Sequence, residues 1–390
     1  MNYYKKHNTY GKLKNVLLGS YFYPEFFSKL KNDKIKTPLQ RIAEEILEDL
    51  DNFDSVLKSF GCYVLRAPHP TGYFDLEDVF PPSLQIRNNH CVIGDTLYQF
   101  DEDYRFSSNS VLTAFCPNII DLSSENIDIY HQVCKNSADS YNSNTKTWFS
   151  LSKYQELQGA DWPQFKDYVQ GNYQCSNHIQ AEIDSYYESI AYEIKEFRPL
   201  QSPNVLNLDD KIYIDAHEYY DYASWLRAYC NDSRPIEQFT SKVGHVDGCF
   251  NILNKNTIIG IHPFIDYDRY FPEFDIIKVD PDSYQSKIHE FKLLQERIGG
   301  RWWVPGEEYN LQFVDFVENY LEPWLGRVHE TIFDVNVLVL DEKTVCVSNI
   351  TKQVAAEFKK RRIEYIVVPW RHRFFVDGGL HCITLDLTRE

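Results

Sequence analysis

The sequence predicts an α/β protein built from a repeated unit of hairpin, helix and return strand. Short apolar runs interrupted by a polar turn recur along the chain, and stretches with helical periodicity lie between them. Apolar segments that favour single strands then follow these helices. With 43% hydrophobic and 25% charged residues, the 390-residue chain has a globular composition that excludes wholesale disorder, collagen-like sequence and a coiled coil.

Each interrupted apolar run indicates two strands joined by a hairpin. The breakers GD, DD, NKN and DEK are good turn formers, and the Val, Ile, Leu and Tyr residues on either side suit half-buried strands. The four runs cover residues 90–100, 204–215, 250–261 and 335–348, and a single run near the start covers 15–20. Five such places predict internal repetition, although their uneven spacing excludes a regular solenoid.

Helical periodicity between the hairpins predicts that a helix forms the middle of each repeated unit. Gly61 and Gly299 stand where helices commonly end, and strand candidates such as CYVLRAP and YIVVPW follow the predicted helices. The predicted helices cover residues 39–61, 181–197, 225–230, 286–300 and 350–363.

The domain organisation follows from what separates these units. Residues 121–180 are polar and rich in aromatic side chains, and we expect loops with one or two short helices there. No long Gly/Ser or Pro linker divides the chain. We therefore expect a single domain over residues 1–390.

The charge balance argues against polyanionic partners. Forty basic against fifty-seven acidic side chains give a net charge of −17, which repels phosphate backbones and anionic lipid, so we expect neither nucleic acid nor a membrane as partner. The nine cysteines are an odd number without a C-x-x-C pair, and the start of the chain lacks a long apolar stretch. These features indicate a cytoplasmic protein.

Common cofactor motifs do not occur in the sequence. Neither G-x-x-x-x-G-K-S/T nor G-x-G-x-x-G after a strand is found, so ATP and dinucleotides are not indicated. The pairs His90–Cys91, His381–Cys382 and His245/Asp247 lack familiar ligand spacing. We expect no metal and no cofactor.

A cysteine near the C-terminus is the first candidate for chemistry. The segment Asp377-Gly378-Gly379 frees the backbone for a sharp turn, and Cys382 then precedes the apolar strand ITLDL. A cysteine there can project from a tightly set edge as a nucleophile. The alternative is a small buried residue, which is the usual role of a free cysteine.

The segment G-H-V-D-G-C-F at 244–250 is the second candidate. On a strand, His245 and Asp247 would point to one face and reach one cavity. A thiolate, an imidazole and a carboxylate form a covalent-catalysis set where they converge. A purely structural histidine is the alternative interpretation.

These segments resemble the glycine amidinotransferase family. VNVLVLDEKTVCVS followed by DGGLHCITLDLTR is similar to the C-terminal part of that family, which carries G-G-G-x-H-C-x-T. GHVDGCFNIL resembles its H-I/V-D-x-x-F-N-I/V segment, and IRNNHCVIGDTLYQ resembles its first active-site strand, where A-R-D precedes an apolar run. The similarity covers most of the chain in order and is strongest over 245–261 and 335–389.

The resemblance implies the pentein fold, in which five ββαβ modules surround a pseudo-fivefold axis with the active site at the centre. It also implies that Cys382 is the nucleophile that attacks the guanidino carbon of arginine. His245 would be the acid and base, and Asp247 a guanidinium ligand. The five hairpin-like places fit this fold independently.

Departures from the family pattern fall mainly on residues expected to bind substrate. Asn88 replaces the aspartate that follows arginine in the first strand. One alignment places Gln201 at the aspartate that orients the catalytic histidine, and Asn204 at a later polar position. The alternative alignment places Asp215 or Glu218 there instead. Surface or turn positions are the alternative interpretation of the three amides.

The positions that recognise the acceptor in the family also differ in this sequence. His329 and Glu330 lie where the family has serines that recognise the acceptor, so glycine as acceptor is in doubt. Arg371 lies in the loop before the catalytic strand, where it would meet a substrate carboxylate or solvent.

We therefore expect a cytoplasmic amidinotransferase with small-molecule substrates, namely arginine as donor and an undetermined amine as acceptor. A hydrolase of the same fold, in which water resolves the amidino-cysteine, is one alternative. A non-catalytic binding protein is another, which the missing carboxylates would favour and which the retained Cys382, His245 and Asp247 oppose. The oligomeric state stays open, with a homodimer as one option.

Overall fold

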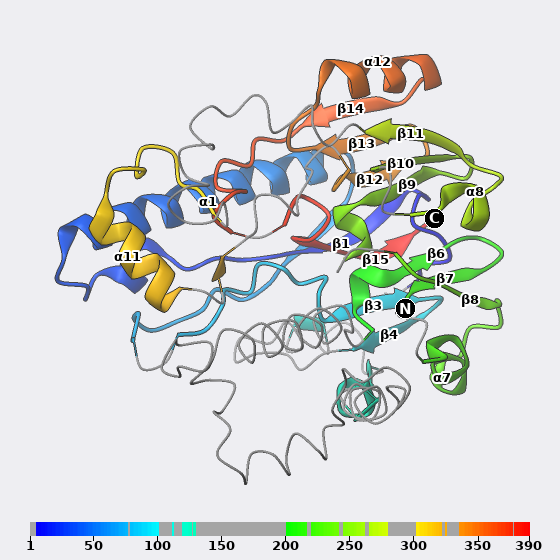
Figure 1. Cartoon of the computed structure of the whole chain (residues 1–390), viewed down its shortest axis with the longest axis horizontal. Helices are drawn as coiled ribbons and strands as arrows, with labels where there is room; N and C mark the ends of the chain where they lie inside the picture. The colour runs from blue at the N-terminus through cyan, green and yellow to red at the C-terminus, as the bar shows by residue number, and fades with distance from the viewer. Residues whose placement is uncertain are drawn as a thin grey trace, which may run out of the picture.

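Five three-stranded sheets form the body of the protein (Figure 1). The computed structural model describes residues 5–76, 79–100, 111–112, 119–126, 128–129, 200–216, 220–241, 245–261, 265–279, 302–321, 324–325, 335–376 and 378–390. In each sheet an antiparallel pair is extended by a third, parallel strand. This is the pattern expected for five repeated ββαβ units.

Four of the sheets follow one another along the chain. All four predicted hairpins are confirmed as their antiparallel pairs, and the YIVVPW segment is confirmed as a parallel third strand. The sheets are β3 (His90–Ile93), β4 (Thr96–Gln99) and β5 (Ile119–Asp121); β6 (Val205–Asn207), β7 (Ile212–Asp215) and β8 (Ile236–Phe239); β9 (Phe250–Asn254), β10 (Thr257–Ile261) and β11 (Asp275–Val279); and β12 (Leu338–Asp341), β13 (Thr344–Val347) and β14 (Glu364–Val367).

The fifth sheet joins the two ends of the chain. Strand β1 (Leu13–Leu18) pairs antiparallel with β15 (Thr384–Arg389) and parallel with β2 (Tyr63–Arg66). The early apolar run therefore finds its hairpin partner in the last strand, and CYVLRAP supplies the return strand. This pairing brings the segment that carries Cys382 beside the N-terminal strand.

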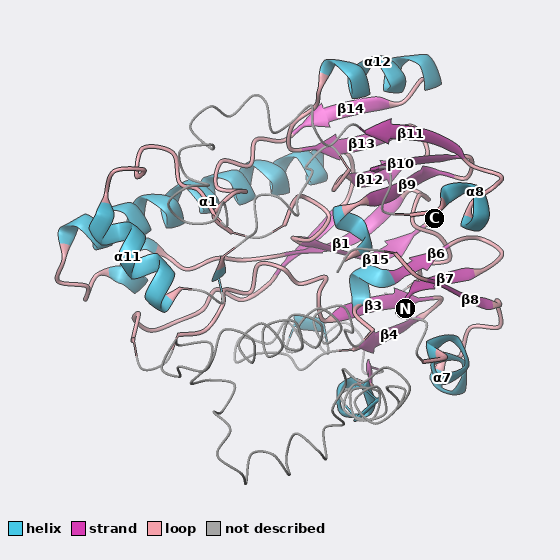
Figure 2. Ribbon diagram, in the orientation of Figure 1, coloured by secondary structure: helices cyan, strands magenta, loops and turns pink. Residues whose placement is uncertain are grey.

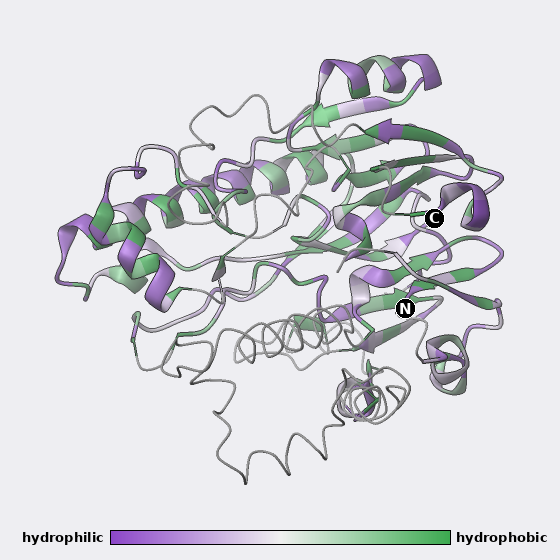
Figure 3. Cartoon of the chain, viewed as in Figure 1, coloured by the Kyte–Doolittle hydropathy of each residue, from purple (hydrophilic) through white to green (hydrophobic). Residues whose placement is uncertain are grey.

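The longest helix, α1 (Asp33–Ser59), connects β1 to β2. Its buried side chains recur at helical spacing, and Figure 3 shows hydrophilic and hydrophobic patches alternating along it. The helix begins earlier than the predicted residue 39 because the Asn32 side chain caps it by accepting from the Lys34 N–H, and Pro38 is accommodated inside it. It ends at the predicted place, just before Gly61, whose φ is +94°.

Most of the other helices lie around the strands, which gather in one half of the view in Figure 2, whereas the helix Leu311–Tyr320 lies beside α1. The predicted helices at 225–230 and 350–363 are confirmed with shifted bounds. The described α-helices besides α1 are α7 (Tyr222–Tyr229), α8 (Tyr267–Tyr270), α11 (Leu311–Tyr320) and α12 (Lys352–Arg361). The described 3₁₀ turns are η1 (Pro24–Phe27), η2 (Ser202–Asn204) and η3 (Val246–Gly248).

Apolar side chains fill the space between neighbouring sheets. Strands β3, β4, β7 and β10 are buried along their whole length, so residues on both faces pack against other elements. Each large aliphatic side chain buried in this way contributes about 1.5–3 kcal/mol. The apolar packing thus holds the strand ends, which carry the polar residues of the candidate site, in fixed positions.

Some expectations lie outside the described residues. These are the helices at 181–197 and 286–300, Gly299, and nearly all of the loop region at 121–180. A single domain over 1–390 stays a prediction. Among the residues that the structure describes, no helix is both long and apolar enough to span a membrane.

Candidate active site

The turn that carries Cys382 requires glycine at two positions. Gly378 has a φ of +92°, and a Cβ there would lie 2.6 Å from the Cβ of Cys382. A Cβ on Gly379 would lie 2.6 Å from Oδ1 of Asn336. The Trp370 indole N–H donates to the Gly378 carbonyl at 3.1 Å, which fixes the turn from the preceding loop. The predicted sharp turn is therefore present; Asp377 lies outside the described residues.

Cys382 and Asp247 meet in a buried contact. The thiol of Cys382 lies 3.4 Å from Oδ2 of Asp247, and the two residues are 6% and 2% exposed. Nδ2 of Asn336 lies 3.0 Å from the same sulfur. The structure thus brings together the predicted nucleophile and the predicted guanidinium ligand.

His381 holds one oxygen of the Asp247 carboxylate. Its Nδ1 lies 2.7 Å from Oδ2, and burial together with the charge of Arg87 lowers the pKa of His381 to about 4. The imidazole is therefore neutral at pH 7 and donates its Nδ1–H to a carboxylate that can only accept.

The remaining Asp247 oxygen is available to a ligand. Burial alone would raise the pKa of Asp247, but the hydrogen bond from His381 and the charge of Arg87 oppose it, and the pKa is lowered. Oδ1 of this carboxylate is buried and has no hydrogen-bond partner among the residues that the structure describes. A buried, ionised oxygen of this kind favours a cationic donor.

His245 lies beside this carboxylate, but its local structure differs from the expectation. The segment 245–247 is not a strand: His245 is the N-cap of η3, and Asp247 lies within that turn. The turn forms because the backbone N–H of Val246 donates to Oδ1 of Asn204 at 2.9 Å. Nε2 of His245 lies 2.6 Å from Oε1 of Gln201.

These contacts bear on the two alignments left open by the sequence. Gln201 and Asn204 both contact the His245 segment, as the first alignment requires. Asp215 instead bonds to the Ser241 backbone and hydroxyl at 2.7 and 2.5 Å, and burial raises the pKa of Asp215 to about 6. Glu218 lies outside the described residues.

Arg87 and Asn88 border the nucleophile turn. The Arg87 backbone N–H donates to the Cys382 carbonyl at 3.4 Å, and its Nε donates to the His381 carbonyl at 2.9 Å. The neighbouring Asn88 has a buried Oδ1, which no group in the described part of the chain contacts by a hydrogen bond. The predicted position of Asn88 beside the nucleophile is thus compatible with a role in binding a donor ligand.

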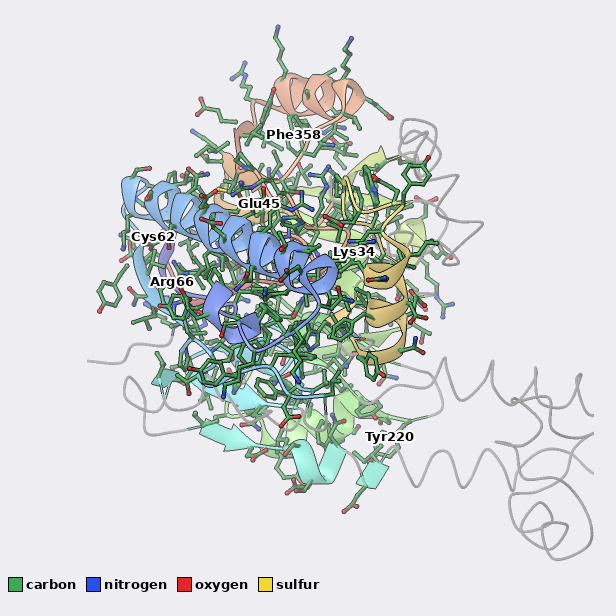
Figure 4. All side chains as sticks on the ribbon, turned by 90° about the vertical axis from the view of Figure 1, so that its left-hand side faces the viewer. Lys34, Glu45, Cys62, Arg66, Tyr220 and Phe358 are labelled. Carbon is green, nitrogen blue, oxygen red and sulfur yellow. The ribbon has the colours of Figure 1, made fainter. Side chains whose placement is uncertain are left out.

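Arg371 is held elsewhere, by α1. Its Nε lies 2.9 Å from Asp49, and its Nη2 lies 2.8 Å from Glu48. The adjacent His372 contacts Glu45 at 2.5 Å, and Figure 4, which looks onto α1, shows Glu45 midway along that helix. The structure therefore does not bring Arg371 to the group around Cys382. His329 and Glu330 lie outside the described residues.

Sequence reasoning missed two residues of this site. In the sequence, His381 stands out only as half of a His–Cys pair that lacks metal-ligand spacing, although it directly precedes the nucleophile. Asn336 was not singled out, although it is one polar residue in the apolar run VNVLVL, which is a usable signal. Among the described residues, no group of three or more His, Cys, Asp or Glu side chains is arranged to hold a metal ion.

Solved structures resemble this chain over its whole length. The amidinotransferase SxtG of the saxitoxin biosynthetic pathway of Microseira wollei matches with a TM-score of 0.58 and 14% identity, covering 100% of this chain and 98% of the other. The inosamine-phosphate amidinotransferase of Streptomyces griseus matches with a TM-score of 0.53 and 14% identity, covering 99% and 97%. This chain has the pentein fold.

The pentein fold explains why segments far apart in sequence meet at Cys382. Asp247 lies just before β9, Asn336 lies just before β12, and Cys382 lies in the turn just before β15, which closes the fifth sheet. At the level of sequence, no protein-family model and no curated protein matches the chain significantly. The similarity of this pentein protein to the two enzymes is thus one of fold.

Proposed function

We propose that this protein is an amidinotransferase that takes the amidino group of arginine onto Cys382 and passes it to an amine. The observation that carries the proposal is the contact between the Cys382 thiol and an Asp247 carboxylate whose other oxygen is buried and has no partner within the described ranges of the chain. The two amidinotransferases of the same fold support it.

The unpaired acceptors suit a guanidinium group. Guanidinium carries only N–H donors, and a carboxylate oxygen accepts them with charge assistance. Oδ1 of Asp247 and Oδ1 of Asn88 are both buried acceptors beside the nucleophile turn. One carboxylate and one amide would thus replace the pair of carboxylates that the resemblance leads one to expect.

The bound cation also favours the reactive form of the thiol. An ionised carboxylate 3.4 Å from the sulfur disfavours a second negative charge there. A guanidinium paired with Asp247 cancels this repulsion, so substrate binding would promote ionisation of Cys382.

We assign the covalent step to Cys382 and His245 as follows. The thiolate of Cys382 attacks the guanidino carbon, and an S–C bond forms. The C–N bond to the ornithine nitrogen breaks, and that nitrogen takes from His245 the proton that His245 received when the Cys382 thiol ionised. In the second half, the acceptor amine attacks the amidino carbon, the S–C bond breaks, and His245 recovers the proton from the amine. Gln201 contacts the imidazole through a neutral amide, which orients the ring without adding charge.

The proposal is tested by the mass of the protein and of its products. With arginine and no acceptor, intact mass should show one amidino adduct, and a panel of amines should release it as new guanidino compounds. Citrulline in place of those compounds would identify a hydrolase instead. Arginine binding without any adduct would identify a binding protein.

Asn88→Asp should tighten arginine binding by about tenfold, or about 1.4 kcal/mol, because a carboxylate binds guanidinium with charge assistance. The rate of adduct formation should change less. Calorimetry on a Cys382→Ala background, with and without Asn88→Asp, measures the affinity. Asn89→Asp, which adds the same charge one residue away, is the matched control. Unchanged or weaker binding in the Asn88 variant would mean that Asn88 does not contact the donor.

A further inference from the structure

Asn336 is buried between the turn that carries Cys382 and the segment that carries Asp247. It precedes β12 and is 0% exposed. Val335 and Val337 on either side are also fully buried and pack in the core between neighbouring sheets. The three residues form a bend in which the Val337 N–H donates to the Val335 carbonyl at 2.9 Å, and the two apolar neighbours anchor the backbone on either side of Asn336.

The carboxamide of Asn336 makes four contacts, all with the site. Nδ2 lies 3.0 Å from the Asp247 carbonyl oxygen and 3.0 Å from the Cys382 sulfur. Oδ1 accepts from the backbone N–H groups of His381 and Cys382 at 3.0 and 3.4 Å.

These partners fix the orientation of the amide. Two backbone N–H groups can only donate, and the Asp247 carbonyl can only accept. The reversed amide would place donor against donor and acceptor against acceptor. An N–H of Asn336, and not its oxygen, therefore faces the sulfur of Cys382.

We infer that Asn336 is a further catalytic residue, which stabilises the Cys382 thiolate through its Nδ2–H and holds the nucleophile turn against the Asp247 segment. The inference rests on the proposed role of Cys382 as nucleophile. A hydrogen bond to the charged form of a group favours that form, and here it opposes the repulsion from the Asp247 carboxylate. In the transfer reaction the same N–H also faces the sulfur as the S–C bond breaks and the negative charge returns.

The thiol itself provides the test, because its alkylation requires no substrate. Iodoacetamide reacts with the thiolate: the proton is lost to water, an S–C bond forms and iodide leaves. The rate of Cys382 labelling, followed by peptide mass against pH, should move to higher pH by about one unit in Asn336→Asp, with about a tenfold lower rate at pH 7. Asn336→Ala, which removes the donor without adding charge, should move it in the same direction.

Asn251→Ala is the matched control. Asn251 lies in β9, is 5% exposed, and donates Nδ2–H to the Val337 carbonyl at 2.9 Å, so its replacement removes a similar buried hydrogen bond that does not involve the sulfur. An unchanged labelling profile in either folded Asn336 variant, or an equal shift in Asn251→Ala, would overturn the inference.

A measurement on the unchanged protein covers the case in which the Asn336 variants do not fold. The side-chain NH₂ resonance of Asn336, observed with ¹⁵N-asparagine labelling, should titrate with the same midpoint as Cys382 alkylation. A resonance that does not follow the thiol would overturn the inference. If both titrations agree but arginine forms no adduct, then the proposed function fails while the role of Asn336 toward the thiol stands.

Discussion

Cys382→Ser should abolish the covalent amidino adduct and lower amidino transfer by at least about 10³-fold. A thiolate is both a good nucleophile and a good leaving group, whereas a serine hydroxyl stays protonated near neutral pH. Serine has almost the same shape, so the turn fixed by Gly378 and Gly379 should form unchanged. Arginine affinity should therefore stay within about threefold of the original, because the Asp247 oxygen that receives the guanidinium is still present.

Intact mass after incubation with arginine measures the adduct, and calorimetry measures the affinity. Cys230→Ser is the matched control, since Cys230 is partly exposed at the end of α7, where it interacts with Tyr98. Retained turnover in Cys382→Ser, or loss of the adduct in Cys230→Ser, would show that another residue is the nucleophile.

The repeated units were predictable because each is local in sequence. Turn residues such as Gly94-Asp95 lie between short β-branched runs, and the strands they join are only a few residues apart. The closing pair was not predictable in the same way. Asn15 pairs with Thr388, and nothing within either segment identifies a partner more than three hundred residues away. The only sign in the sequence is that the run at 15–20 is single, whereas the other four places are hairpins.

Site residues could be predicted where the chemistry requires a particular residue type. They could not be predicted where their position depends on how distant segments pack. Cys382 and Asp247 were found because thiol and carboxylate are the groups that such chemistry needs. Arg371 lies where it does because it pairs with acidic residues of α1. Glu48 and Asp49 follow Glu45 by three and four residues, so the three lie on one acidic face of that helix. That spacing was visible in the sequence, but not the loop that would pack against it.

Asp386→Asn should lower the free energy of unfolding by about 3–5 kcal/mol, the typical effect of breaking a buried ion pair. Asp386 is 1% exposed and accepts from three buried cations: Lys6 at 2.7 Å, Arg389 at 2.8 Å, and Arg87. Without its charge, three buried cations would share a neutral amide. Arg87 also donates to the His381 carbonyl, so the substitution should loosen the nucleophile turn as well.

The same charges predict how stability depends on pH. Burial alone would raise the pKa of Asp386, but Arg87, Lys6 and Arg389 outweigh it and hold the pKa well below its ordinary value. A carboxyl group whose pKa is lower in the folded state stabilises the protein above its unfolded pKa of about 3.9 and loses that contribution as pH falls toward the folded value. The variant should therefore lose less stability than the original protein between about pH 5 and pH 3.

Urea unfolding at a series of pH values measures both effects. Asp275→Asn is the matched control, because Asp275 pairs with Arg361 through two contacts of 2.6 and 2.9 Å but is 59% exposed, and such pairs contribute at most about 1 kcal/mol. If the two variants lose equally little stability at pH 7, then the buried cations do not depend on Asp386. Arg87 would then be held beside Cys382 by its other contacts and not by the Asp386 carboxylate.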